Sequence, residues 1–390
     1  MSLQLSAVSP VRSADGRVVA AAMAVIAALC WAAEGAGGAG GFRLVLLGAA
    51  MGLVLYHASF GFTAAWRRFI VTGEGRGLRA QMVMLAVAVL LFFPALDAGE
   101  LFGERVGGFV MPAGTSVAVG AFIFGIGMQL GGGCASGTLF TVGGGSVRMV
   151  VTLVFFVIGS VIGTAHLAWW LALPSFGAYS FIHRWGLGPA LAVNLGLFAA
   201  IFLLTIIVER RRGTAAPVHV SADWLRGPWP LLAGAIGLAL LNFATLWIAH
   251  RPWGVTSGFA LWGAKGFALA GADMAGWPYW EKRMAAIEAS IFRDTTSVMN
   301  FGIMAGAMLA AGLAGRFKPS LRLSAVDLLT AIIGGLLLGY GARLAFGCNI
   351  GAFFSGIASG SLHGWLWLVT GFAGNVCGAW LRPRVGLSPV

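Results

Sequence analysis

The chain has 390 residues, of which 59% are hydrophobic and only 10% are charged. A soluble domain of this size carries roughly a quarter charged residues because its surface faces water, so this composition excludes a soluble globular protein. The formal net charge of +12 is typical of the Lys- and Arg-rich cytoplasmic loops of a membrane protein, and nucleic acid is therefore not an expected partner.

Apolar runs of about 17–25 residues recur along the chain, which is the length needed to cross a hydrocarbon core of roughly 30 Å. They predict transmembrane helices at residues 18–33, 42–58, 79–97, 115–131, 148–173, 186–208, 229–249, 291–314, 325–346 and 363–381. The polar start lacks the short apolar core of a cleaved signal peptide, so we expect 18–33 to be retained. The sequence predicts an all-α polytopic membrane protein with about ten transmembrane helices.

Four further segments are too short to cross a membrane. They comprise residues 59–71, 134–143, 256–270 and 348–358. Ten residues of helix extend only about 15 Å, half the hydrocarbon thickness. Such a segment must enter and leave at the same face, and its free backbone ends must be buried in protein or line a wet cavity. We expect four re-entrant half-helices.

The two halves of the chain repeat each other. Aligning 119–140 with 333–354 pairs Gly120 with Gly334, Gly125 with Gly339, Gly127 with Gly341, Leu130 with Leu344, Cys134 with Cys348, and Gly137 with Gly351. After one inserted residue, Gly145-Ser146 meets Gly360-Ser361 and Gly163 meets Gly378. Corresponding elements are displaced by five spans, and this odd number predicts an inverted internal repeat, the layout of many transporters.

The repeat predicts the organisation of the whole chain. Residues 1–41 form a tail and an extra transmembrane helix, 42–185 the first repeat, 186–228 a linker transmembrane helix with a basic cytoplasmic loop, 229–381 the second, inverted repeat, and 382–390 a C-terminal tail. About 16 of the 25 basic residues then fall on the face that holds both termini. This bias predicts that both termini are cytoplasmic.

A cysteine follows glycines at the same place in each repeat, in GMQLGGGCASGTLF (127–140) and GARLAFGCNIGAFF (341–354). Glycines permit a sharp turn, so each cysteine should head a half-helix whose free N–H groups carry partial positive charge. Two such ends converging at mid-membrane would form an anion site without a buried Lys or Arg. A polarizable thiol favours a soft, sulfur-bearing anion.

Other interpretations of the cysteines remain open. A cysteine among glycines can be a small residue at a tight helix contact, although its recurrence weakens that interpretation. A membrane thiol oxidoreductase or sulfurtransferase could use the pair covalently, and an assembly role without transport is a third alternative. The Cys-x-x-Gly spacing lacks the second cysteine of a redox or zinc motif, so we expect no cofactor or metal. Cys30 and Cys377, inside apolar spans, are expected to be packing residues.

The paired motif GxGxxLxxGCxxG resembles that of the YeeE/YedE family of sulfur-compound membrane transporters. The segments GSLHGW (360–365) and SFGFTAAWRRFIVTGEG (59–75) extend the resemblance over roughly residues 42–381. It implies a transporter, not an enzyme, that takes up thiosulfate or a related sulfur or selenium anion across the bacterial inner membrane. It also implies an hourglass-shaped fold in which Cys134 and Cys348 pass the substrate through the constriction.

We expect the motif cysteines and their neighbours to bind the substrate. These residues are Cys134, Cys348, Gly133, Gly347, Ser136, Asn349, Gly137, Gly351, Gly61 and Phe62. Many family members carry a cysteine before the Phe of the first re-entrant segment, where this chain has Gly61-Phe62. The expected partners are a small sulfur-containing anion, the lipid bilayer and, by the resemblance, a small cytoplasmic sulfur-carrier protein.

Overall fold

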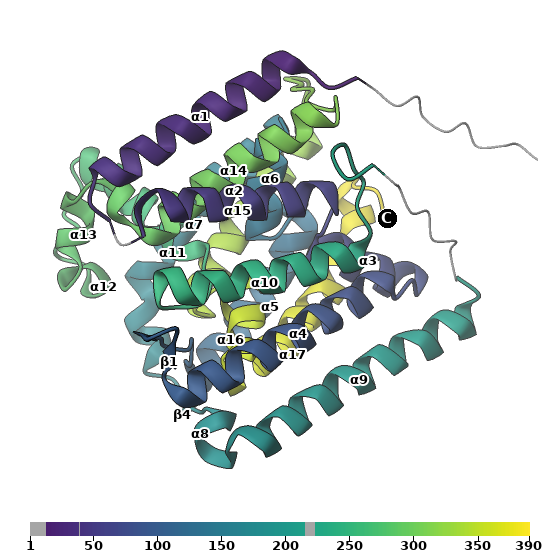
Figure 1. Ribbon diagram of the computed structural model, residues 1–390. Coiled ribbons are helices and arrows are strands. Elements are labelled where there is room, and N and C mark those ends of the chain that lie inside the picture. The colour runs from purple at the N-terminus through teal and green to yellow at the C-terminus, as the bar shows by residue number, and fades with distance from the viewer. Residues whose placement is uncertain (1–12, 39, 215–222) are drawn as a thin grey trace, which may run out of the picture.

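The computed structural model describes residues 13–38, 40–214 and 223–390. Within these ranges the chain is mainly helical, as predicted, and ten helices of 17–26 residues lie at the ten predicted spans (Figure 1). They are α1 (Gly16–Gly35), α2 (Gly41–His57), α4 (Arg76–Ala98), α5 (Thr115–Gly131), α7 (Val147–Leu171), α9 (Leu187–Arg212), α10 (Leu231–Ala249), α14 (Thr295–Leu313), α15 (Ala325–Leu344) and α17 (Leu362–Leu381).

Nine helical stretches in the described ranges are long and apolar enough to cross a membrane, and α17 is not among them. The polar side chains of α17 explain the difference, because His363 and Asn375 lower its hydropathy but are fully buried in the protein. The prediction of an all-α polytopic membrane protein is confirmed. Only 17% of the most apolar part of α1 and of α9 is buried, which places these two helices at the periphery of the bundle (Figure 1).

Short helices occupy the four segments predicted as half-helices. They are α3 (Phe62–Thr72), α6 (Ala135–Gly143), α11 (Thr256–Leu269), and a π-helix, η2 (Asn349–Phe354), that continues into α16 (Ser355–Ala358). The longest, α11, has 14 residues and extends only about 21 Å, less than the hydrocarbon thickness. That these segments enter and leave at one face of a membrane stays a prediction.

The remaining elements are short and connect the helices. They are β1 (Glu100–Leu101), β2 (Glu104–Arg105), β3 (Pro112–Gly114), β4 (Ser175–Ala178), α8 (Phe181–Trp185), α12 (Pro278–Glu281), α13 (Met284–Glu288), η1 (Ile291–Arg293) and η3 (Arg382–Val385). The strands form two antiparallel pairs, β1 with β2 and β3 with β4. In Figure 1, β1, β4, α8, α12 and α13 lie at one end of the bundle, and the C-terminus lies at the other. We call these the α12 end and the C-terminal end.

Glycines bring α5 and α15 into backbone contact in an antiparallel arrangement. Gly120 lies against Gly341, where an added Cβ would be 2.5 Å from the Gly120 oxygen. Gly127 lies against Gly334, where an added Cβ would be 3.0 Å from the Gly334 oxygen. Because the contact runs from 120 to 127 on one helix and from 341 to 334 on the other, α5 and α15 run in opposite directions. Small residues permit this close approach.

The other long helices pack in matching pairs. Helix α7 lies on α15 and α17 on α5, while α2 lies on α14 and α4 on α10. Glycines again mark the contacts, because an added Cβ at Gly125 would be 2.9 Å from the carbonyl carbon of Gly374, and one at Gly339 would be 2.7 Å from that of Gly159. The core therefore lies where the two halves of the chain meet.

Replacing Gly334 with Val should destabilise the fold, because the new Cβ would overlap the Gly131 backbone. Overpacking of this kind costs about 1–3 kcal/mol. The midpoint of thermal unfolding in detergent should fall relative to Gly196→Val, a control on α9 where an added Cβ meets nothing within 4 Å. Equal midpoints for the two variants would show that the α5–α15 contact is not tight.

Candidate functional site

Cys134 heads α6 directly after a glycine turn. Gly132 ends α5 in the left-handed region with φ +88°, which favours glycine. The Cys134 Sγ accepts a hydrogen bond from the backbone N–H of Gly137 at 3.4 Å and lies 3.5 Å from Ser136 Oγ. The backbone N–H of Phe62, the first residue of α3, also faces this thiol. The structure thus gathers three of the predicted site residues around Cys134.

Cys348 heads η2 in the corresponding way. Its Sγ accepts from the backbone N–H of Ile350 at 3.4 Å. The preceding turn differs, because Phe346 takes the left-handed conformation with φ +59° where the first copy uses glycine. Gly347 is needed for close approach, since an added Cβ would lie 2.7 Å from the Ala352 nitrogen. Its carbonyl oxygen accepts from the indole N–H of Trp367 at 3.2 Å.

The two cysteine-headed elements meet inside the protein. Elements α6 and η2 contact each other, and the two thiols lie within electrostatic range of one another. The ring of Phe62 packs edge-on against Phe353 of η2, with centroids 5.8 Å apart. The side chain of Cys134 is 1% exposed and that of Cys348 is 0% exposed. The structure therefore places both thiols in a region that is closed to solvent.

The other predicted site residues lie in four different surroundings. Asn349 is fully buried, and neither atom of its side-chain amide has a hydrogen-bond partner among the described residues. Gly351 borders a cavity at the α12 end, whereas Gly61 borders one at the C-terminal end. Gly133 packs against Met149, so its role here is close packing.

The cavity at the α12 end, which we call the outer cavity, is basic and has a volume of about 580 Å³. Arg251, Arg283 and Arg343 lie on its wall, and Gly347 and Gly351 of the second cysteine motif also line it. The described residues that line it include no Asp or Glu. A concave surface with charges of one sign concentrates ions of the opposite sign, so this cavity favours anions.

Neutral groups hold the three arginines in place. Arg343 Nη1 donates to Tyr279 Oη at 2.8 Å, and Arg251 Nη2 donates to Thr296 Oγ1 at 3.0 Å. The Arg283 guanidinium lies over the Tyr279 ring, 4.4 Å from its centroid. The Arg343 Nε and the indole N–H of Trp253 are buried without a partner in the described chain. Among the described residues, no carboxylate neutralises the positive charge on this wall.

The arginines of the outer cavity were not predicted from the sequence. The anion site that was predicted, at the two thiols and without a buried Lys or Arg, stays a prediction, whereas Arg343 is only 6% exposed and lines the outer cavity. Arg343 lies inside the repeated motif, at the position that Gln129 takes in the first copy. That difference between the two repeats could have drawn attention to Arg343. Arg251 and Arg283 lie in loops outside the repeated motif, so no sequence pattern indicated them.

A second cavity of about 300 Å³, the inner cavity, lies at the C-terminal end of the bundle beside α3 (Figure 1). Gly61, Arg68, Glu74 and Gln81 are among the residues that line it. An added Cβ at Gly61 would meet nothing within 4 Å. Because Gly61 precedes Phe62, whose N–H faces Cys134, this cavity approaches the thiol pair from the other side.

Comparison with known proteins identifies the family. The family model described as "Sulphur transport" matches residues 57–377. This chain belongs to that family. It is 27% identical over 368 residues to the "Thiosulfate transporter TsuA" of Spirochaeta thermophila, covering 87% of this chain and 98% of the relative. It is 25% identical to the TsuA of Escherichia coli over 87% of this chain and 95% of the relative. It is also 32% identical to the "Probable transporter YedE" of Escherichia coli over 43% of this chain and 40% of the relative.

The resemblance to the YeeE/YedE family is thereby confirmed, and the protein is a multi-pass membrane protein of the sulphur transport family. Among the cysteines outside the motifs, Cys30 is partly buried but Cys377 is exposed. The prediction of a packing role is wrong for Cys377, because its side chain lies on the outer face of α17.

Burial predicts the order in which the cysteines react. In detergent, N-ethylmaleimide should modify Cys377 first and Cys134 and Cys348 at least about tenfold more slowly, because a thiol must be accessible and ionised to attack the reagent as the thiolate. Peptide mass spectrometry at timed intervals measures each rate. Modification of Cys348 as fast as Cys377 would show that the centre of the protein is open.

Proposed function

We propose that this protein imports thiosulfate or a closely related sulfur or selenium anion across the bacterial inner membrane, along a path past Cys348 and Cys134. The observation that carries the proposal is the outer cavity, whose arginines have no carboxylate partner among the described residues and whose lining includes Gly347 and Gly351 of the Cys348 motif. Membership in the sulphur transport family and the TsuA relatives support the choice of substrate.

The proposed path has three stages. An anion first collects in the outer cavity, whose lining includes Arg343 and Trp253. Each of these side chains has a buried N–H group without a partner among the described residues, which an anion would reach as the site rearranges. It then passes the closed centre, where two thiols act as weak S–H donors and as polarizable contacts for sulfur. Free N–H groups at the starts of α6 and η2 add partial positive charge there. The inner cavity at Gly61 receives the anion on the other side.

The centre must open for this passage. The Phe62 and Phe353 rings are in contact and both thiols are buried, so the centre is closed to solvent at these residues. Asn349 is buried beside Cys348 with an unpaired amide. A buried polar group without a partner is costly, so a transient ligand would satisfy it as the centre opens. Asn349 would then donate to an oxygen of the anion while the thiols contact its sulfur.

The packing of the long helices supports an inverted repeat as the frame of this path. The sequence alignment pairs Gly120 with Gly334 and Gly127 with Gly341. In the fold Gly120 contacts Gly341 and Gly127 contacts Gly334. Exchanging each glycine for its aligned counterpart turns the first contact into the second. Such an exchange is expected when a two-fold axis relates the two repeats. Since α5 and α15 are antiparallel, this two-fold axis would lie in the membrane plane and bring the half-helices in from opposite faces.

We also propose that the C-terminal end of the bundle faces the cytoplasm. Basic side chains gather there, as the ion pair of Arg79 with Glu209 at 2.5 Å and the hydrogen bond of Arg212 to the Ile70 oxygen at 3.4 Å connect α4, α9 and α3. Residues 1–12 and 215–222, part of the predicted tail and basic loop, lie outside the described residues. A basic cytoplasmic face would suit an acidic sulfur-carrier protein, which remains a proposal.

Uptake of labelled thiosulfate tests the function. Cells that lack other uptake routes should accumulate it when they express this protein, and Cys134→Ala or Cys348→Ala should abolish accumulation at unchanged protein levels. Normal uptake by both variants would remove the thiols from the mechanism. A persulfide or disulfide trapped on either cysteine during turnover would instead favour the covalent sulfurtransferase or oxidoreductase.

The outer cavity makes a separate prediction. Arg343→Gln should raise the apparent KM for thiosulfate by about tenfold or more, because a hydrogen bond to a charged group contributes about 1.5–3 kcal/mol. Arg105→Gln, an exposed residue of β2 at the same end, is the matched control and should leave the KM unchanged. An unchanged KM in Arg343→Gln would exclude this cavity as the entry site.

A further inference from the structure

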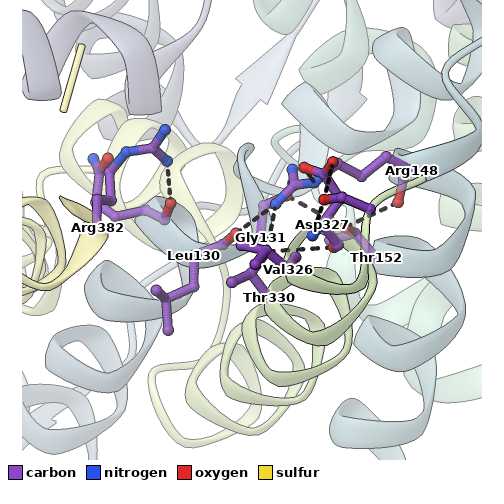
Figure 2. Close-up of polar contacts among 10 residues, drawn as sticks. Leu130, Gly131, Arg148, Thr152, Val326, Asp327, Thr330 and Arg382 are labelled. Carbon is purple, nitrogen blue, oxygen red and sulfur yellow. Dashed lines mark hydrogen bonds and ion pairs between the residues drawn. The ribbon is translucent and has the colours of Figure 1, made fainter. Parts of the chain in front are cut away.

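The end of α5, directly before the Cys134 turn, is held by two arginines. The last carbonyl groups of a helix have no partner within it. The Met128 oxygen accepts from the Gly132 backbone N–H at 3.0 Å. Of the next three carbonyl oxygens, that of Gln129 accepts from Arg382, and those of Leu130 and Gly131 accept from Arg148 (Figure 2).

Arg148 forms a fork between the two repeats. Its Nη2 donates to the Leu130 oxygen at 2.8 Å and to Thr330 Oγ1 at 3.1 Å, and its Nη1 donates to the Gly131 oxygen at 3.0 Å. Its Nε forms an ion pair with Asp327 Oδ1 at 3.3 Å. Asp327 and Thr330 lie in the first turns of α15, the helix that leads to Cys348 (Figure 2). One side chain of α7 thus ties the end of α5 to the start of α15.

Arg382 holds the same helix end from the other side. It is 8% exposed and donates to the Gln129 oxygen and, through Nε, to the Ser388 oxygen at 2.8 Å. The Gln129 side chain donates to the Thr63 oxygen at 3.3 Å and to Asn375 Oδ1 at 2.6 Å. Thr63 follows Phe62 in α3, so Gln129 connects this helix end to the segment that faces the Cys134 thiol.

The second repeat has a different arrangement at the corresponding place. The offset that pairs Gly145-Ser146 with Gly360-Ser361 aligns Arg148 with His363. The His363 ring lies 2.6 Å from Ser361 Oγ and accepts from the Met111 backbone. The Leu344 oxygen at the end of α15 accepts from Ser116 Oγ at 2.7 Å. Of the two helix ends that precede the motif cysteines, arginine donors among the described residues thus hold only the end of α5.

We propose that Arg148 and Arg382 are positioning residues for Cys134. They donate to the last three carbonyl oxygens of α5, of which that of Gly131 also accepts from Thr152 Oγ1 at 3.3 Å. In this way they fix the glycine turn at 131–133 and the direction of the thiol. Positive charge at a helix C-terminus also suits the helix dipole. The inference rests on the proposed function for its effect on transport, and on geometry alone for its effect on the thiol.

The test uses the full-length protein in membranes with Arg148→Met, which removes the donors at similar side-chain length, and Arg148→Lys, which keeps the charge. A lysine cannot reproduce the planar fork to two carbonyls, so both variants should behave alike. The maximal rate of thiosulfate uptake should fall by about tenfold or more with a KM changed less than about threefold, since misplacement of a contact group by about 1 Å has effects of this size. Arg211→Met, an exposed arginine at the end of α9, is the control and should match the wild type.

Comparing the labelling rates of Cys134 and Cys348 separates a positioning role from general destabilisation. The rate of N-ethylmaleimide modification should rise severalfold at Cys134 and stay unchanged at Cys348, measured in the same samples by peptide mass spectrometry. An equal rise at both thiols, or wild-type uptake and labelling in Arg148→Lys, would overturn the proposal. Cys134→Ala is measured alongside. If the wild type shows no uptake, the proposed function fails, while the labelling ratio still decides the positioning role.

Discussion

The fold depends on how a helix can end in the buried centre of a membrane protein. In hydrocarbon every backbone N–H and C=O needs a partner, so a broken helix is tolerated only where the protein supplies one. Here the ends of α5 and α15 receive donors from Arg148, Arg382 and Ser116. The cysteines accept from the first N–H groups of α6 and η2. The thiols are therefore part of what makes the two chain breaks possible, as well as proposed contacts for the substrate.

The two ends of the bundle differ in how they use positive charge. At the α12 end, Arg251 and Arg343 donate to hydroxyl groups, and the described lining of the outer cavity contains no carboxylate, so their charge acts on whatever enters. At the C-terminal end, Arg148 and Arg382 are engaged by carbonyl oxygens and, for Arg148, by Asp327. The arginines at the α12 end are thus arranged to attract an anion, whereas those at the C-terminal end donate to backbone carbonyl oxygens. This division would favour entry from the α12 end.

Much of the fold could be predicted from sequence because its signals are local or repeated. The length of apolar runs located the ten long helices, and the leftover segments located the four short ones. The π-helix at Asn349–Phe354, which contacts α17 and α6, could not be predicted, since the apolar pattern locates a helical segment but not its hydrogen-bond pattern. Cys377 was misjudged because hydropathy locates a helix but not the face that meets lipid.

The site was predictable only in part, for a similar reason. The repeated glycines and cysteine drew attention to Cys134 and Cys348, and the fold brings them together. The cationic wall could not be foreseen because Arg251, Arg283 and Arg343 come from separate loops and helix ends that meet only in three dimensions. In the sequence analysis, basic residues were interpreted only as indicators of which face of the membrane a loop lies on. The role of Arg148 was hidden because a basic residue at the end of a span looks like an ordinary cytoplasmic anchor.

The central claim is that a sulfur anion passes directly beside both buried thiols. Protection of the thiols by substrate tests it most directly. Thiosulfate should slow the modification of Cys134 and Cys348 by N-ethylmaleimide in membranes, half-maximally near the KM for uptake, while sulfate at the same concentration should not. If both thiols are modified at the same rate with and without thiosulfate, at concentrations where uptake is saturated, the account is contradicted.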